Sequence, residues 1–445
     1  MLIKRKLTIF IVLAISITTI ISNSSQLLTY ASNFSHENFD ILDEHIIKDV
    51  PYIGQETNFY CAYACLTMLL NHFEEINTTL QDVVYYTGVG YSMIYPSFLE
   101  KRMPFSGTFC SQAPEEIEFL TSLFGLSRNS WAPEPDSIDK ELCWQEYWIR
   151  VKQNISNNVP ILTSVDPFKL SSFRKIVDLP DFFWGKIPPG GHGIVIVGYN
   201  ESNKTICYND PAQALFGHPE YGKYAWMNLT DFNEAVFRTQ GSKYVVVTFK
   251  KVSEPFSKQE AFNISHARNL EKLRGNLSVY GEFFVDLSKG AEFGINGSKL
   301  MQSHFEKGIN NRYKTIIIYK LQAKLGILYR LLKILSPIVV NLLDLPPGCA
   351  EKYTADVFGR IAIEKSWVAD FLNNNSDFSN ICEYEAMLFE NEAEQWNKIS
   401  SYYEVFKKKG VFLSLPRAIL ATNRMNDTMG KIIEIEDAIL NCKIK

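Results

Sequence analysis

Two apolar runs separated by a short polar segment constrain the fold of this chain more than any other feature. The runs Gly193–Tyr199 and Thr205–Tyr208 are rich in β-branched and aromatic residues, which are common in strands. The five residues between them, 200–204, are polar or charged. This arrangement predicts an antiparallel β-hairpin, and such a hairpin needs further strands or a helix to cover its apolar faces.

The hairpin carries two residues suited to acid–base chemistry. A loop centred on Glu201 places His192 opposite Asp210, and the Cβ atoms of opposed residues lie about 4.5–5.5 Å apart. At that distance a carboxylate can orient an imidazole and stabilise its protonated form. A register shift of one residue would bring Asn209 into this place instead. His218, in a turn-like segment, is the alternative base.

A second feature is a helix predicted to start near Cys61. Apolar residues recur with helical spacing from Ala62 to Phe73. With Asn58 as N-cap, Cys61 lies in the first helical turn, where the helix dipole favours an anion and lowers the pKa of a thiol. Because the thiolate is the attacking species, Cys61 is the candidate nucleophile. Cys65 is the alternative nucleophile, but its place on the apolar face favours a buried structural role.

Gln55 lies six residues before Cys61, on the approach to the predicted helix. We expect its side-chain amide to donate to the oxyanion of a tetrahedral intermediate, beside the backbone amide of Cys61. Each of these residues alone has an ordinary structural explanation. The catalytic hypothesis therefore depends on Gln55, Cys61, His192 and Asp210 meeting in space.

The length and pattern of the chain predict two domains. Its 445 residues exceed one typical domain. Residues 46–252 combine the helix and the hairpin with strand-like runs at Pro160–Val165 and Tyr244–Lys250, which predicts an α+β domain with a mainly antiparallel sheet. From residue 253 to 445 the apolar residues follow helical spacing, so we expect a mainly α-helical second domain.

Residues 1–31 resemble an export signal. Basic residues 4–6 precede a charge-free apolar run at 7–21, and residues 29–31 resemble a cleavage site. The run is shorter than the roughly 20 residues of a membrane span, so we interpret it as a signal peptide, with an N-terminal anchor as the alternative. Both predict a protein that is secreted or anchored at the outer face of the cell membrane. The eight cysteines are too few for a disulfide scaffold.

Charge and motif spacing bear on partners and cofactors. The net charge of −4 gives no general attraction for nucleic acid. No Cys-x-x-Cys pair is present and the seven histidines do not fall at zinc-site spacings, so we expect no metal and no cofactor. The segment from Lys314 to Lys333 is basic and amphipathic. Its ordinary interpretation is a solvated helix face, and contact with a membrane surface is the alternative.

These motifs resemble the bacteriocin-processing peptidases, papain-like domains that cleave leader peptides after paired glycines, and their stand-alone relatives. The resemblance lies in the segment from Gln55 through Cys61 to Leu69, and in the segment His192–Tyr199 followed by Asn209-Asp210-Pro211. It covers residues 50–250.

The resemblance implies a papain-like fold, with an N-terminal helix packed on an antiparallel sheet. It also implies Gln55 in the oxyanion hole, Cys61 as nucleophile, His192 as base and Asp210 as the residue that orients the base. The expected activity is hydrolysis of a peptide or amide substrate through a thioester acyl-enzyme.

The sequence departs from this family at several points. Ala62 stands where the family usually has glycine. The aromatic-rich insertion from Pro96 to Tyr147 is long enough to reshape a substrate groove. No phosphate-binding Gly-x4-Gly-Lys loop is present, which argues against leader processing coupled to transport.

Two other functions remain open from the sequence. Residues 353–371 and 384–399 resemble the helical half of the butirosin-biosynthesis acyltransferase, whose other half is papain-like. That resemblance implies acyl transfer to an amine by the same cysteine and histidine. The third hypothesis is a catalytically inactive binding module that retains the fold.

Overall fold

The computed structural model describes residues 42–57, 59–96, 104–107, 113–134, 140–176, 189–280, 291–310, 354–378, 382–413 and 415–442. The predicted export signal, Asn58 and the basic segment 314–333 lie outside these residues. The chain divides into two compact units. The first unit comprises Met1–Val83 and Glu118–Phe256, and the second comprises Val84–Ile117 and Ser257–Lys445.

A seven-stranded sheet forms the centre of the first unit, and every strand pair in it is antiparallel. β1 (Glu44–Ile46) pairs with β6, and the other strands follow the order β4 (Leu126–Trp131), β9 (Val246–Lys251), β5 (Ile161–Val165), β6 (His192–Asn200), β7 (Thr205–Asn209) and β8 (Ala225–Asn228). The predicted antiparallel sheet and its four strand-like runs are confirmed within two residues at each end. The strands β1, β4 and β8 were not predicted.

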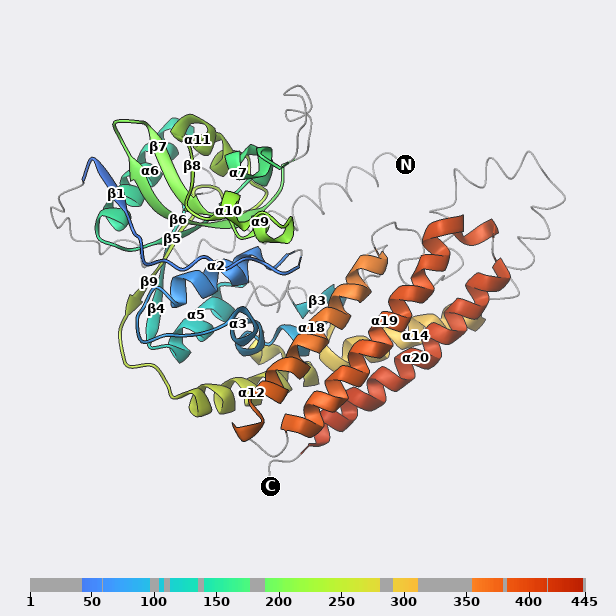
Figure 1. Ribbon diagram of the computed structural model, residues 1–445. Helices are drawn as coiled ribbons and strands as arrows, with labels where there is room; N and C mark the ends of the chain where they lie inside the picture. Colours follow the sequence, from blue (N-terminus) through green and yellow to red (C-terminus); the bar gives the residue numbers. More distant parts are fainter. Residues whose placement is uncertain are drawn as a thin grey trace, which may run out of the picture. The chain divides into compact units, whose positions relative to one another are not determined.

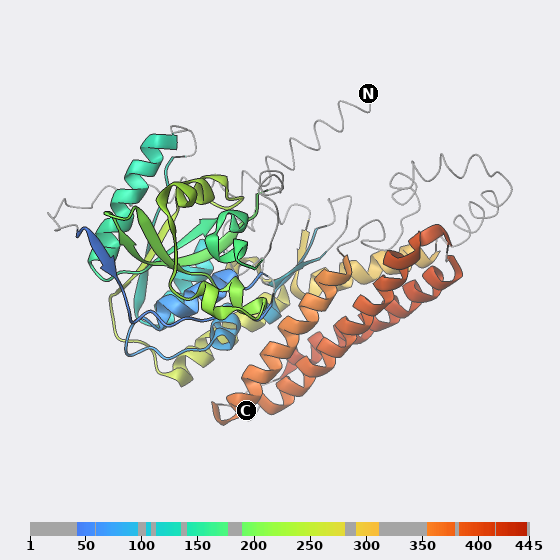
Figure 2. The same ribbon diagram turned by 45° about the horizontal axis from the view of Figure 1, so that its top comes forward.

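Helices cover this sheet on opposite sides (Figures 1 and 2). α2 (Cys61–Leu70) packs against β5, β6 and β9, and eight of its residues are buried. α11 (Leu229–Arg238) packs against β5, β7 and β8, and α6 (Lys140–Ser156) against β5, β6 and β9. Figure 1 shows α2 below β6, β7 and β8, and α11 at the upper side of these strands. The mixture of helices with an antiparallel sheet confirms the α+β class.

The second unit consists largely of helices within the described residues. Its helices are α12 (Lys258–Arg274), α14 (Gly294–Asn310), α18 (Thr354–Asn374), α19 (Cys382–Leu413) and α20 (Leu415–Asn441), with short helical turns η2 (Val89–Tyr91), η4 (Leu277–Val279) and η6 (Ser376–Phe378). A small sheet is formed by β10 (Ala291–Phe293), β2 (Met93–Pro96) and β3 (Phe105–Ser106). Along the chain, α3 (Leu80–Tyr86) and α5 (Pro114–Leu123) cross the boundary between the units.

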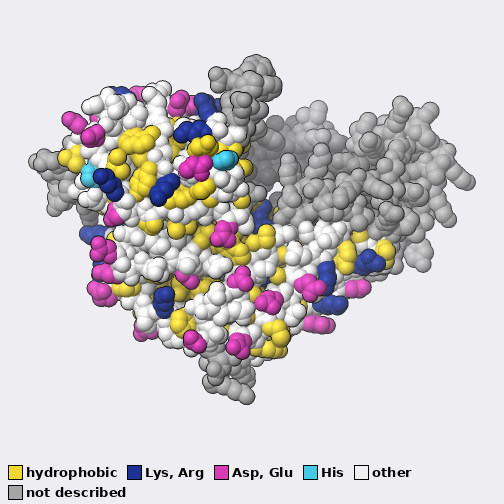
Figure 3. Space-filling view, viewed as in Figure 1, with side chains coloured by type: hydrophobic (Ala, Val, Ile, Leu, Met, Phe, Trp, Pro, Cys, Tyr) yellow, Lys and Arg dark blue, Asp and Glu magenta, His cyan; other side chains and the backbone are white. Residues whose placement is uncertain are grey.

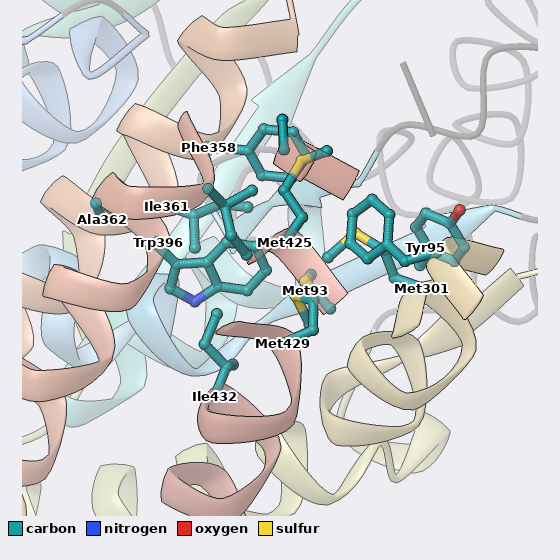
Figure 4. Packing of buried hydrophobic residues seen from close by; sticks show 13 residues of the cluster. Met93, Tyr95, Met301, Phe358, Ile361, Ala362, Trp396, Met425, Met429 and Ile432 are labelled. Carbon is teal, nitrogen blue, oxygen red and sulfur yellow. The ribbon is translucent and has the colours of Figure 1, made fainter. Parts of the chain in front are cut away.

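The assignment of residues 84–117 to the second unit differs from the sequence interpretation, which placed them in the catalytic domain. Met93 and Tyr95 of β2 belong to the same buried cluster as Met301, Phe358 and Trp396 (Figure 4). These side chains come from β2, α14, α18 and α19. Because β2 is buried among these helices, its segment belongs to the second unit. The local pattern of the sequence does not indicate this packing.

Candidate active site

Cys61 is the first residue of α2 and is partly buried. The N-cap is Tyr60, whose side chain makes no capping hydrogen bond, so the prediction of Asn58 as N-cap is wrong. Phe59, directly before the cap, has a φ of 75°, which is a costly backbone conformation for a bulky residue. The chain therefore turns sharply into α2, and the first helical amides are left without a side-chain cap.

The surroundings of Cys61 stabilise its thiolate. Burial raises the pKa of the Cys61 thiol, but a hydrogen bond with His192, the charge of His192, and the backbone amides of Gly193 and Ala62 act in the opposite direction. The net effect holds the pKa below its usual value. Amide donors at a helix start and a neighbouring cation are the features that activate a thiol.

His192 opens β6, and its Nε2 lies 2.7 Å from Asp210 Oδ1. Both side chains are buried. Burial lowers the pKa of His192, but the charge of Asp210 and hydrogen bonds to Asp210 and Cys61 outweigh it and raise that pKa to about 10. Because Nε2 faces Asp210, Nδ1 is the ring nitrogen left for the thiol. The arrangement favours a thiolate beside an imidazolium.

Asp210 is held as a carboxylate by several donors. Its Oδ1 also accepts from the backbone N–H of Ala212 at 3.0 Å, and its Oδ2 accepts from Ser172 Oγ and Gln213 Nε2, each at 2.7 Å. Burial raises the pKa of Asp210, but the charge of His192 and these hydrogen bonds lower it further than burial raises it. Four acceptor contacts fix both the charge and the orientation of this carboxylate.

The hairpin register differs from the predicted one. In β6 and β7, Val195 faces Asn209, so continuing the register places Asp210 opposite Ile194 and diagonal to His192. Nearer the turn, Gly198 faces Cys207, and the register shifts by one residue between Ile196 and Gly198. The β-bulge at this shift was not visible in the alternation of apolar residues, because both faces of β6 are buried.

Gln55 is buried in the segment that leads to α2. Its backbone N–H donates to Pro211 O at 3.0 Å, which ties it to the residue after Asp210. Its side-chain Nε2 donates to Thr57 O at 3.0 Å, while Oε1 has no hydrogen-bond partner in the described part of the chain. One N–H of the side-chain amide is thus engaged and the other remains for a ligand.

The alternative residues from the sequence lie in other surroundings. Cys65 is fully buried in α2, and burial followed by the charges of Cys61 and Asp210 raises the pKa of its thiol well above the usual value. His218 Nδ1 lies 3.2 Å from Glu220 Oε1 on a partly exposed turn. Asn209 Oδ1 accepts from the backbone N–H of Tyr224. None of the three has a recorded contact with Cys61 and His192 together among the described residues.

Sequence reasoning missed the residues that support Asp210. Gln213 lies three residues after Asp210, so a local search for donors could have found it. Ser172, which supports Asp210, and Gly193, whose backbone amide contacts Cys61, gave no usable signal, because their contacts depend on the packing of distant segments. In the described residues, the six cysteines are free, and no group of three or more His, Cys, Asp or Glu could hold a metal ion. No helix in the described part of the chain is long and apolar enough to cross a membrane.

The thiol, the imidazole and the carboxylate meet inside a segment with a known family pattern. Residues 47–243 match the Peptidase_C39 like family. No curated protein matches the chain. The match contains Gln55, Cys61, His192 and Asp210, and it supports a cysteine-peptidase type of hydrolase for the Peptidase_C39-like region. The second unit lies largely outside the matched residues.

Proposed function

We propose that this protein is a papain-like cysteine peptidase or amidase that hydrolyses a peptide or amide bond through a thioester acyl-enzyme. The observation that carries the proposal is the contact of His192 with both Cys61 and the buried carboxylate of Asp210. The match to the Peptidase_C39 like family supports the same chemistry. A hydrogen-bonded line of thiol, imidazole and carboxylate is what nucleophilic catalysis by cysteine requires.

In the first half of the reaction, the Cys61 thiolate attacks the carbonyl carbon of the scissile bond. The developing oxyanion receives hydrogen bonds from the backbone amide of Cys61 and from the free N–H of Gln55. As the tetrahedral intermediate collapses, the C–N bond breaks and the His192 imidazolium gives its proton to the departing nitrogen. The acyl group stays on sulfur as a thioester, and His192 becomes neutral.

In the second half, neutral His192 takes a proton from water, which attacks the thioester carbonyl. The C–S bond breaks, the acid product leaves, and the thiolate and imidazolium are restored. Asp210 keeps the imidazole in the orientation that serves both steps and stabilises its charged form. An amine could replace water in this step, so the same residues support the acyl-transfer hypothesis as well.

Product analysis tests the proposal and separates it from acyl transfer. The full chain is incubated with a library of synthetic peptides, and mass spectrometry identifies the products. New C-terminal acids that disappear in Cys61→Ala are expected. In a second incubation, amines are added at the same concentration as the peptides. Formation of new amides without new acids would then favour acyl transfer. If neither new acids nor new amides depend on Cys61, the inactive binding module is favoured.

We further propose that the protein acts outside the cytoplasm. The basic and apolar pattern of residues 1–31 supports secretion or anchoring at the outer face of the membrane. Expression of the full chain with a C-terminal epitope tag, followed by cell fractionation and N-terminal sequencing, tests this. A cytoplasmic protein with an intact N-terminus would overturn the proposed location.

A further inference from the structure

Three aromatic rings form a row in the first unit beside the candidate active site. Phe168 and Phe173 have ring centroids 5.4 Å apart, and Phe173 and Phe216 have centroids 5.8 Å apart. Both pairs meet edge to face. Phe216 is 45% exposed, so the row reaches the surface. Figure 3 shows hydrophobic side chains gathered on the face of the first unit that carries β7, β8, α7 (Ser171–Arg174) and α10 (Pro219–Gly222).

Each ring belongs to a segment that is tied to His192 or Asp210. Phe168 lies in η3 (Pro167–Lys169), and a Cβ added at Gly190 would lie 3.6 Å from its ring, two residues before His192. Phe173 lies in α7 (Ser171–Arg174), next to Ser172, which donates to Asp210.

Phe216 follows α9 (Ala212–Leu215), which begins two residues after Asp210. Its backbone N–H donates to the carbonyl of Gln213, whose side chain donates to Asp210. The segments of Phe173 and Phe216 therefore contain donors that hold the Asp210 carboxylate, and Phe168 lies near Gly190, two residues before His192. Phe216 is nearly half exposed, so part of its ring is accessible at the end of the row.

The position of His192 between Cys61 and Asp210 indicates which part of a substrate lies near the three aromatic rings. The imidazole lies between the sulfur and Asp210, because Nε2 contacts Asp210 and the thiol lies on the other side of the ring. In the proposed reaction the imidazolium gives its proton to the departing nitrogen, so the leaving group must lie over His192. The substrate beyond that nitrogen then runs toward Asp210 and its supporting segments.

We propose that Phe168, Phe173 and Phe216 form a subsite for an apolar or aromatic side chain on the amine side of the scissile bond. The inference rests on the proposed function and deepens it by naming the class of leaving group. By microscopic reversibility, the same subsite binds an amine that attacks the acyl-enzyme. Burial of an aromatic side chain against three rings favours such an amine over one without a side chain.

Partitioning of an acyl-enzyme between water and added amines tests the subsite without knowledge of the natural substrate. The full chain is acylated with p-nitrophenyl acetate in the presence of Gly-Gly-amide, Phe-Gly-amide or Gly-Phe-amide at equal concentrations. In the aminolysis step the amine attacks the thioester, its proton passes to His192, and Cys61 leaves as thiolate. After subtraction of the products formed with Cys61→Ala, which are uncatalysed, the ratio of acetylated dipeptide to acetate is independent of the acylation rate.

We expect at least one phenylalanine dipeptide to give a ratio about tenfold above that of Gly-Gly-amide. Phe216→Ala should remove most of this preference, and Phe216→Leu should retain part of it. Phe256→Ala is the matched control, because Phe256 is similarly exposed, at 48%, in the same unit. Within the described residues, its segment makes no contact with His192 or Asp210. The ratios of Phe256→Ala should equal those of the unmodified chain.

The outcomes separate the inference from the function on which it rests. Acylation of Cys61 with equal ratios for all amines, or a preference that survives Phe216→Ala, would overturn the subsite and leave the proposed function standing. No acyl-enzyme on Cys61 would overturn both. Size-exclusion chromatography of the same proteins completes the test. Self-association that Phe216→Ala abolishes would assign the row to a contact between copies and overturn the subsite.

Discussion

His192 and Asp210 meet diagonally across the β6–β7 hairpin, with 2.7 Å between Nε2 and Oδ1. The bulge between Ile196 and Gly198 makes this meeting possible. If the register nearest the turn continued without the bulge, Asn209 would share the sheet face of His192. The bulge restores Asp210 to that face, because side chains alternate with a period of two residues.

Removing the Asp210 carboxylate should move the alkaline limb of the pH–activity profile to lower pH. Asp210 supplies the charge and the hydrogen bond that raise the pKa of His192 to about 10 against the effect of burial. In Asp210→Asn the imidazolium loses its proton at lower pH, and the thiolate loses its cation. We expect the alkaline limb of activity to move from near pH 10 toward neutrality, and acyl-enzyme formation to fall by about a hundredfold or more.

Rates of acylation by p-nitrophenyl acetate between pH 5 and 11 measure this effect. Asp231→Asn, at an exposed position in α11, serves as the control and should keep the unmodified profile. An Asp210→Asn profile with an unchanged alkaline limb would show that His192 is not tuned by this carboxylate.

Ser172 should contribute to the same tuning through Asp210. Its hydroxyl donates to Asp210 Oδ2 at 2.7 Å, and a buried hydrogen bond to a charged group contributes roughly 1.5–3 kcal/mol. Ser172→Ala should therefore leave the Asp210 carboxylate less firmly oriented toward His192, and shift the pH profile of Cys61 alkylation by chloroacetamide toward that of an ordinary thiol. Ser171→Ala is matched, since Ser171 contacts Tyr208 and the Trp226 carbonyl but has no recorded bond to Asp210. Equal profiles for both variants would contradict the role of Ser172.

From the sequence, the residues of the candidate site were easier to predict than the backbone geometry that brings them together. Helical spacing placed Cys61 at the start of α2, and strand composition placed His192 at the start of β6, because both patterns are local. The contact of His192 with Asp210 was predicted from a wrong register that shares its parity with the true one. The prediction of Asn58 as N-cap was wrong, because the next residue, Phe59, has a positive φ that no local preference of the sequence indicates.

Other features depend on packing that a single sequence does not encode locally. The segment of residues 84–117 reads as part of the catalytic domain, yet Tyr95 is buried with Trp396 of α19. Ser172 reaches Asp210 across 38 positions of sequence. α6 is an exception, because its Trp144, Tyr147 and Trp148 follow the i, i+3, i+4 spacing of one helix face and Trp144 packs against both other rings, yet this helix was not predicted.

Gln55→Ala should separate oxyanion stabilisation from thiol activation. If the free N–H of Gln55 donates to the developing oxyanion, acylation by p-nitrophenyl acetate should fall by about 10²–10³. Alkylation of Cys61 by chloroacetamide should remain unchanged, because halide displacement forms no tetrahedral oxyanion. Gln145→Ala, at an exposed position in α6, should change neither rate. A parallel loss of both reactions in Gln55→Ala would indicate a structural role for Gln55.

A buried carboxylate in the second unit should make stability depend on pH. Burial, together with the charge of Glu392, raises the pKa of Glu436 from its ordinary 4.5 to about 8. Between these pH values the folded chain keeps a proton that the unfolded chain has released. The free energy of unfolding therefore falls as pH rises through this window, by up to about 1.4 kcal/mol per pH unit.

Glu436→Gln should reduce this fall, since glutamine does not ionise and its carbonyl can still accept from Ser298 Oγ, which lies 3.1 Å from Glu436 Oε1. Glu385, whose pKa burial also raises to about 8, keeps its own contribution to the pH dependence. Urea unfolding followed by circular dichroism at pH 5, 7 and 9 measures the change. Asp437→Asn, at the exposed neighbouring position, is the control. The prediction fails if Glu436→Gln retains the pH dependence of the unmodified chain.

Selective alkylation at low pH tests the thiolate beside His192 most directly. The folded chain is treated with iodoacetamide at pH 6.5, and the labelled cysteines are identified by mass spectrometry over time. Cys61 should react at least about tenfold faster than glutathione. This rate should be unchanged in Cys65→Ala and lower in His192→Ala. Labelling of Cys65 in preference to Cys61, or a Cys61 rate that His192→Ala leaves untouched, would contradict the account.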